Sequence, residues 1–163
     1  MNSLGIRVTS EEIIYIVYKS DLKEFIFKIY KRPSFLSLPE FLKYIRYNFL
    51  DILISYKIEY VAIKKIEYNA KNIDFERIAI EGVIQEALAS SDILDYYIET
   101  KQSLNTINEI GINYKKIMNS SNKFKDSLKE YGDMRNLDMN DEKNKEAVLC
   151  SIIAFKKGKN NGK

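Results

Sequence analysis

The side chains that could do chemistry in this chain are carboxylates and amines, because it has no histidine and only one cysteine, Cys150. Without histidine, the pairs Ser90-Ser91 and Ser120-Ser121 cannot form a serine–histidine triad. A zinc site would have to combine carboxylates with a single thiol, which is not a ligand set that zinc favours. Any bound metal would therefore be a hard ion held by oxygen, and Cys150, which lies among apolar residues, is predicted to belong to the core.

The bulk composition is that of an ordinary globular protein. Of the 163 residues, 45% are hydrophobic and 30% are charged. The net charge of +3 is mild for a dedicated nucleic-acid binder, which needs a cation for each phosphate contact. We expect a cytoplasmic protein with no membrane contact, because the sequence shows neither a long apolar run nor a secretory signal, and its lone cysteine excludes an internal disulfide.

Two short segments mix basic and aromatic residues, as nucleic-acid surfaces do. One contains Lys28, Lys31 and Arg32, and the other is Lys115-Lys116. Lysines on an edge strand also protect a protein against aggregation, and we favour that interpretation.

The elements that must position these side chains follow from the hydrophobic periodicity. Alternating patterns predict strands at 3–9 and 23–31, and a run of β-branched and aromatic residues predicts a strand at 12–19. A three-to-four-residue period predicts a helix at 38–55, with Ser37 and Glu40 as a capping box. Further along the chain we predict a buried strand at 59–65, a helix at 73–90, a strand at 95–99, a short helix at 100–107, partly helical structure at 113–131 and a loop at 132–140. A last helix runs from 141 to 155. We expect a single domain at 1–155 and a disordered basic tail at 156–163.

This order predicts an α/β fold with a five-stranded mixed sheet. Three sequential antiparallel strands are followed by two helix-strand crossovers, whose right-handed sense places the last two strands parallel to the first. Helices should then cover both faces. The layout resembles the RNase H-like superfamily, and most closely the RuvC-type Holliday junction resolvases, over nearly the whole chain. Small uncharacterised bacterial proteins of the same fold are similar in length.

Four short segments carry the resemblance. Leu4-Gly5-Ile6-Arg7 resembles the opening strand of the family, and Val61-Ala62-Ile63-Lys64 resembles its fourth strand. Residues 80–84, centred on Gly82, resemble a helix whose small residue lets it lie close to the sheet, and Glu146-Ala147-Val148-Leu149 resembles the final helix. Enzymes of this family cut phosphodiesters with paired divalent metals, which are held by carboxylates on these strands and this helix.

The resemblance assigns the carboxylate positions to Arg7, Lys64, Lys143 and Glu146, of which only Glu146 is acidic. Because cations repel a divalent metal, we predict neither a metal site nor another cofactor, and we identify no catalytic residue. Acids displaced to other places could in principle substitute for the missing ones: Glu67, Glu99, Asp141 and Glu142. In a continuous strand Glu67 would face away from Lys64, because side chains alternate between the faces.

Two interpretations of the basic residues remain open. In the first, which we favour, a salt bridge such as Arg7 or Lys64 with Glu146 fills the former metal site. In the second, Arg7, Lys64 and Lys65 form an anion pocket that binds phosphate without cutting it. We therefore expect a catalytically inactive RuvC-like protein that binds a protein partner or a second copy of itself. The alternatives are a non-cleaving nucleic-acid binder and a diverged metal-dependent nuclease.

Overall fold

A five-stranded mixed sheet forms the centre of the protein. A computed structural model describes residues 1–67, 72–105, 111 and 113–161. The strands are β1 (Asn2–Val8), β2 (Glu12–Lys19), β3 (Glu24–Lys31), β4 (Tyr60–Lys64) and β5 (Asp95–Glu99). They lie in the order β3-β2-β1-β4-β5; β1 to β3 pair antiparallel, whereas β4 pairs parallel with both β1 and β5. The predicted sheet is confirmed.

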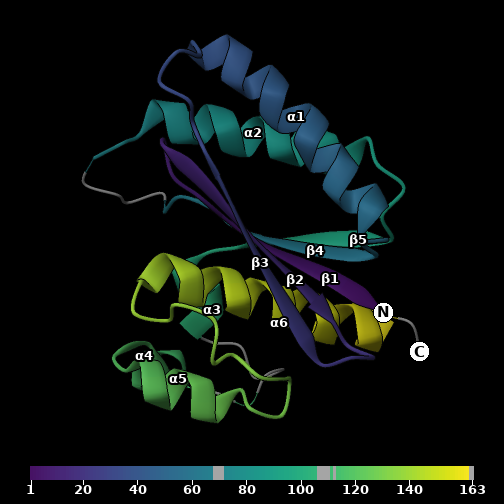
Figure 1. Ribbon diagram of the computed structural model, residues 1–163, viewed down its shortest axis with the longest axis vertical. Helices are drawn as coiled ribbons and strands as arrows, with labels where there is room; N and C mark the ends of the chain where they lie inside the picture. The colour runs from purple at the N-terminus through teal and green to yellow at the C-terminus, as the bar shows by residue number, and fades with distance from the viewer. Residues whose placement is uncertain (68–71, 106–110, 112, 162–163) are drawn as a thin grey trace.

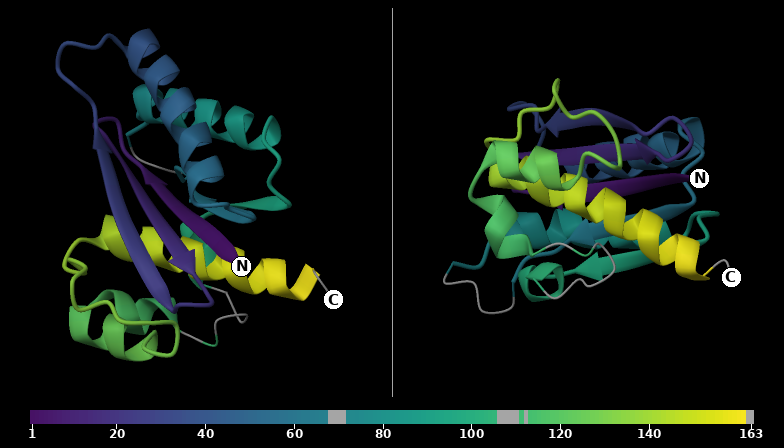
Figure 2. Two further views of the ribbon diagram at one scale, coloured as in Figure 1. Left: turned by 45° about the vertical axis from the view of Figure 1, so that its right-hand side comes forward. Right: turned by 90° about the horizontal axis from the view of Figure 1, so that it is seen from below.

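Helices cover both faces of this sheet (Figure 1). On one face lie α1 (Leu38–Ser55) and α2 (Phe75–Ala89), and on the other lies α6 (Glu142–Asn161). The short helices α3 (Lys101–Asn105), α4 (Tyr114–Met118) and α5 (Ser121–Ser127) lie on the α6 side, and α4 and α5 pack beyond α6 (Figure 2). The predicted short helix at 100–107 is thus seen as far as 105, and its remainder lies outside the described residues. Among the described residues, no helix is long and apolar enough to cross a membrane.

Helix α1 begins where the capping box predicts. The backbone N–H of Ser37 donates to Glu40 Oε2 at 2.8 Å, and its carbonyl accepts from the N–H of Phe41 at 3.0 Å. These bonds satisfy polar groups that the start of a helix otherwise leaves unpaired. The apolar stripe then faces the sheet, with the following side chains buried: Phe41, Ile45, Phe49, Ile52 and Leu53.

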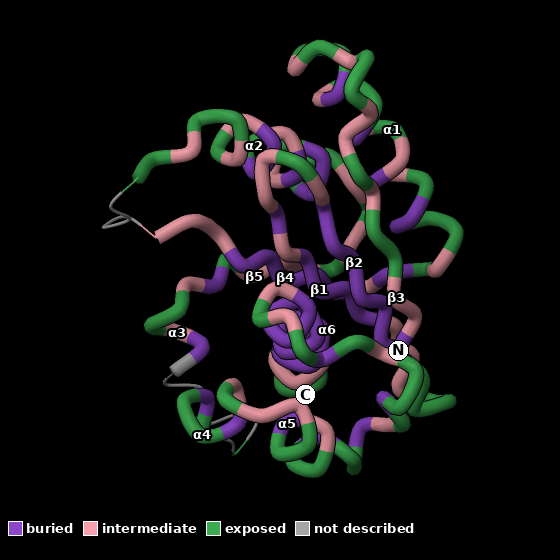
Figure 3. Tube along the Cα trace, turned by 60° about the vertical axis from the view of Figure 1, so that its left-hand side comes forward, coloured by how far each residue is buried: buried purple, intermediate pink, exposed green. Residues whose placement is uncertain are grey.

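Helix α6 is buried on all sides between the sheet and the short helices. Every residue from 144 to 154 is buried (Figure 3). The close approach to β1 depends on Gly5, because a Cβ atom there would lie 2.0 Å from the carbonyl oxygen of Ala147 and 2.3 Å from the backbone nitrogen of Ser151. The prediction that Gly82 allows close packing is wrong, because a Cβ there would meet nothing within 4 Å.

The predicted disordered tail is also wrong for residues 156–161, which continue α6 as far as Asn161. Side chains on this last part of the helix have partners on the sheet. Gly158 is buried against the ring of Tyr60, and Lys157 Nζ lies 2.8 Å from Glu99 Oε1. These contacts give the polar sequence a surface on which to remain helical. Residues 162–163 lie outside the described residues.

Candidate functional site

Three charged residues form a row across the carboxyl ends of the parallel strands. Arg7 of β1 is the register partner of Lys64 of β4, and Lys64 is the partner of Glu99 of β5. Strand alternation places all three on the face that α6 covers. Lys64 is only 3% exposed and Glu99 only 2%. The fold therefore brings Arg7 and Lys64 together at the place that the sequence predicts, inside the protein rather than on its surface.

Arg7 is held by the one acid among the four family positions. Its Nε lies 2.5 Å from Glu146 Oε2 on α6, and its guanidinium also donates to the carbonyl of Val8. The hydroxyl of Tyr114, from α4, lies 3.3 Å from Glu146 Oε1. Burial and the nearby charges of Glu146 and Glu142 raise the pKa of Tyr114, so its hydroxyl stays protonated and can donate. The salt bridge that we favoured from the sequence is present in its Arg7 form.

Lys64 has a partner of its own. Its Nζ lies 2.5 Å from Glu67 Oε1 and donates to the carbonyl of Lys65 at 2.9 Å. The prediction that Glu67 faces away from Lys64 is wrong, because β4 ends at Lys64 and the chain turns before Glu67. Burial raises the pKa of Glu67, but hydrogen bonds from Lys64 and from the backbone of Lys101 outweigh it, and the net shift is downward.

A third ion pair borders these two, and sequence reasoning missed it. Arg77 Nε on α2 lies 2.7 Å from Glu81 Oε1, and Glu81 Oε2 accepts from the N–H of Ile66 at 3.1 Å. Burial, followed by the positive charge of Arg7, lowers the pKa of Arg77, so the two guanidinium groups are close enough to repel. The sequence does contain a signal for this pair, because Arg77 and Glu81 are oppositely charged and four residues apart on α2, shortly after its N-cap Asp74.

The remaining acids are also engaged. Glu99 accepts from Lys157 at 2.8 Å and from the hydroxyl of Ser103 at 2.6 Å. Glu142 lies 3.4 Å from Lys101 Nζ. Lys143, the fourth family position, does not face Arg7; it lies 2.7 Å from Glu12 on β2 and 3.5 Å from Asp141. The hydrogen bond with Glu12 raises the pKa of Lys143.

Comparisons with known proteins bear on the fold alone. No protein-family model and no curated protein matches the chain. The structure of RuvC from Thermus thermophilus is similar over 99% of this chain and 97% of that one, with 13% identity and a TM-score of 0.69. The same resolvase in complex with Holliday junction substrate gives 13% identity, coverage of 98% and 95%, and a TM-score of 0.66. The yeast mitochondrial Holliday junction resolvase Ydc2 matches with 7% identity, coverage of 94% and 77%, and a TM-score of 0.65.

This chain has the RNase H-like fold of the RuvC-type resolvases. The metal pair that such a fold implies can be tested against the residues present here. Mg²⁺ needs several oxygen ligands in near-octahedral geometry. Arg7 and Lys64 instead place a guanidinium and an ammonium group at this end of the sheet, and the nearest carboxylates already contact cations. Among the described residues, no group of three histidine, cysteine, aspartate or glutamate side chains could hold a metal ion. The residues do not fit a metal pair.

The basic residues that the sequence singled out on and just after β3 do not join this site, although Lys31 and Arg32 both line a separate depression. Alternation places Lys28 and Lys31 on opposite faces of the strand. Arg32 is committed to Glu76 at 2.8 Å and to the carbonyl of Leu36. Lys65 lies next to Lys64 in sequence, but it lines a separate depression beside α2. The structure thus brings Arg7 and Lys64 together and keeps the β3 cations apart from them.

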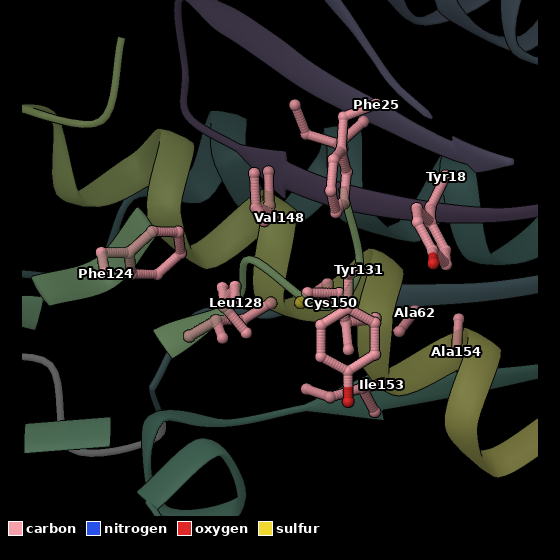
Figure 4. Packing of buried hydrophobic residues seen from close by; sticks show 14 of the residues in the cluster. Tyr18, Phe25, Ala62, Phe124, Leu128, Tyr131, Val148, Cys150, Ile153 and Ala154 are labelled. Carbon is pink, nitrogen blue, oxygen red and sulfur yellow. The ribbon is translucent and has the colours of Figure 1, made fainter. Parts of the chain in front are cut away.

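Cys150 lies in the core, as predicted. It is fully buried on α6, in the cluster that includes Leu128, Val148 and Ile153 (Figure 4). Burial raises the pKa of its thiol well above the ordinary value, which keeps the sulfur protonated and a poor nucleophile.

Proposed function

We propose that this protein is a catalytically inactive member of the RuvC fold class, and that it acts by binding. The observation that carries the proposal is the Arg7–Glu146 ion pair at 2.5 Å. It occupies the one acidic side chain that remains at the family's four carboxylate positions. Lys64 and Lys143, at two of the other positions, have carboxylate partners of their own.

Electrostatics supports the loss of activity. A divalent ion beside Arg7 and Lys64 would face two positive charges in a buried region where water screens poorly. To bind, it would have to displace Arg7 from Glu146, which leaves a guanidinium buried without its counter-charge. Removing one partner of a buried ion pair costs about 3–5 kcal/mol. That cost opposes metal binding in addition to the direct repulsion.

The competing function is a diverged nuclease whose acids have moved to Glu67, Glu99, Asp141 or Glu142. Each of these four carboxylates contacts a lysine: Lys64, Lys157, Lys143 and Lys101, respectively. This pairing argues against a metal-binding role, because each ligand would first have to release a cation.

A cleavage assay tests the proposal. The protein is incubated with branched, duplex and RNA–DNA hybrid substrates in Mg²⁺ or Mn²⁺, and thermal melting with and without Mn²⁺ reports metal binding directly. We expect no metal-dependent cleavage, and no rise in melting temperature with Mn²⁺ beyond that of the Glu146→Gln variant. Metal-dependent cleavage that Glu146→Gln abolishes would overturn the proposal.

The partner of this binding protein could be a protein, a second copy of the chain, or nucleic acid. One observation favours nucleic acid as a second candidate function: Lys28 and Lys31 are exposed on β3, and neither forms an ion pair with a described residue. The structural neighbours include RuvC and a fowlpox virus resolvase, each in complex with Holliday junction DNA. Fluorescence anisotropy with labelled DNA over a salt series tests this candidate, because affinity from phosphate contacts falls steeply with salt.

For the anion pocket of Arg7, Lys64 and Lys65, the expected result is negative. Arg7 and Lys64 are buried and already paired with carboxylates, so they are poorly placed to reach a phosphate. We expect Arg7→Ala and Lys64→Ala to leave DNA affinity unchanged within about twofold, provided that the variants are folded. A tenfold loss in both would support the pocket instead.

A further inference from the structure

A basic groove lies at the other end of the strands from the Arg7 site. It has a volume of about 450 Å³ and lies between the β2–β3 turn and the segment that joins α5 to α6. Four cations line it: Lys23 from the turn, Lys125 from α5, and Lys129 and Arg135 from the segment that follows α5. Lys23 is more than 100 residues away from the other three in sequence, so the fold is what brings the four together.

The backbone at this groove is fixed by close packing. Gly132 touches the β2–β3 turn, because a Cβ atom there would lie 2.0 Å from the carbonyl oxygen of Lys23. Its φ of 151° also lies in a region that favours glycine. The neighbouring Tyr131 is buried and meets Tyr18 edge to face, with ring centroids 6.2 Å apart (Figure 4). Leu128 and Met134 are buried on either side. Close packing therefore fixes the backbone on both sides of the groove.

The charge in this groove is not balanced. Arg135 forms an ion pair with Asp133 at 2.7 Å. Lys23, Lys125 and Lys129 have no carboxylate of the described residues within ion-pair distance, and Asp126 is the only other acid that lines the groove. The contrast with the Arg7 site is clear, because Arg7, Lys64 and Arg77 each contact a glutamate. An excess of two positive charges in a concave surface favours an anionic ligand.

We propose that this groove binds the phosphodiester backbone of a nucleic acid. The inference rests on the proposed function only in taking the protein to act by binding. A charged groove with a buried methionine suits a polyanion better than a membrane, because membrane-surface sites need projecting apolar side chains. Lys125 on α5 and Lys129 in the turn after it both line the groove, so their ammonium groups share one concave surface, as contacts to neighbouring phosphates require.

Fluorescence anisotropy with labelled single-stranded, duplex and four-way-junction DNA tests the proposal across a salt series. In the Lys125→Glu/Lys129→Glu variant, we expect affinity to fall by about tenfold or more and the magnitude of the salt slope to fall by about 2. Both side chains lie outside the core, and circular dichroism checks that the variant is folded. The Lys125→Arg/Lys129→Arg variant keeps the charge and should bind like the unmodified protein.

The matched control is Lys43→Glu/Lys57→Glu, which makes the same change of charge at exposed positions on α1 and in the turn after it. We expect this control to lose less than threefold in affinity, because its lysines lie away from the groove. Equal losses of DNA affinity in the two variants would mean that binding responds to the net charge of the protein, and would contradict the proposed site. A loss only in the control variant, or binding to phosphatidylserine vesicles but not to DNA, would also overturn it. None of these results bears on cleavage, so the groove can fail while the inactivity of the protein stands.

Discussion

Arg7 and Glu146 provide the sharpest test of how the charges at the carboxyl ends of the parallel strands are stabilised. We consider replacement of each residue by methionine, which matches the length of glutamate and the aliphatic part of arginine, and removes the charge. Glu146→Met would leave Arg7 facing Arg77, and the pKa of Arg77 is already lowered by burial and by the charge of Arg7. Arg7→Met would leave Glu146 with the hydroxyl of Tyr114 and with the positive charge of Arg77 nearby. The two single variants should therefore differ in cost.

The magnitude follows from burial. The side chain of Arg7 is 14% exposed and that of Glu146 is 6% exposed, so this is a buried ion pair. Loss of one partner from such a pair costs about 3–5 kcal/mol, and we assign Glu146→Met to that range. Arg7→Met should cost less, about 1–3 kcal/mol, because the charge that it leaves behind is a carboxylate with a cation and a hydroxyl close by. The double variant should cost less than the sum, because it leaves no unpaired charge, with a coupling of about 1–3 kcal/mol.

Urea unfolding followed by far-ultraviolet circular dichroism measures these costs, provided that the slope with denaturant is unchanged. For a chain of this size, a loss of 3–5 kcal/mol also lowers the melting temperature by roughly 6–20 °C. The exposed pair Arg46–Glu86, at 2.8 Å, is the matched control, and its loss should change stability far less because solvent screens the two charges. If Arg7→Met costs more than Glu146→Met, or if the two costs simply add, the picture of a shared buried network is wrong.

Three further predictions concern single positions. Gly5→Ala should destabilise the protein by about 2 kcal/mol or more, because its Cβ would meet the backbone of α6, whereas Gly82→Ala should stabilise α2 by up to about 1 kcal/mol in thermal melts. Because burial raises the pKa of Cys150, its thiol should resist Ellman's reagent at pH 8 until urea unfolds the chain; rapid reaction of the native protein would contradict this. The pKa of Glu67 is lower in the folded state than in the unfolded state. The stabilisation from its ionised carboxylate is therefore present above the unfolded pKa of about 4.3 and is lost as the pH falls. Glu67→Gln should flatten the pH dependence of the unfolding free energy between about pH 6 and 3.

The fold could be predicted well because its elements carry strong local signals. The run of β-branched and aromatic residues in 12–19 and the capping box at Ser37 each specify one element, and the right-handed crossover rule then arranges the parallel strands. The errors came where local pattern and tertiary contact disagree. Residues 156–161 are too polar to predict a helix on their own, but Lys157 and Gly158 find partners on the sheet. Gly82 matched a family pattern, yet the contact that needs a glycine is made by Gly5 on β1.

The sequence predicts which residues lie at the candidate site, but not all of the ion pairs that they form. Register alone places Arg7 beside Lys64, and that much follows from the strand pattern. The partner of Lys64 depends on where β4 ends, because one more strand residue would have turned Glu67 away. Arg77 and Glu81 belong to α2 on the other face of the sheet, so no periodicity connects them with Arg7. Side-chain pairing at the end of a sheet depends on loop geometry, which hydrophobic patterns do not record.

The pairing also explains how this fold tolerates basic residues at the carboxyl ends of its central strands. A lone arginine at the centre of the sheet would be costly, but here Arg7 takes the acid that remains on α6, and Lys64 takes one from the turn after β4. Each of these two basic residues thus neutralises a carboxylate instead of adding an unpaired charge. The charges at this place therefore balance. The same balance removes the ligands that a divalent ion would need. Stability of the fold and binding of a metal are therefore alternatives at this site, because both would use the carboxylate of Glu146.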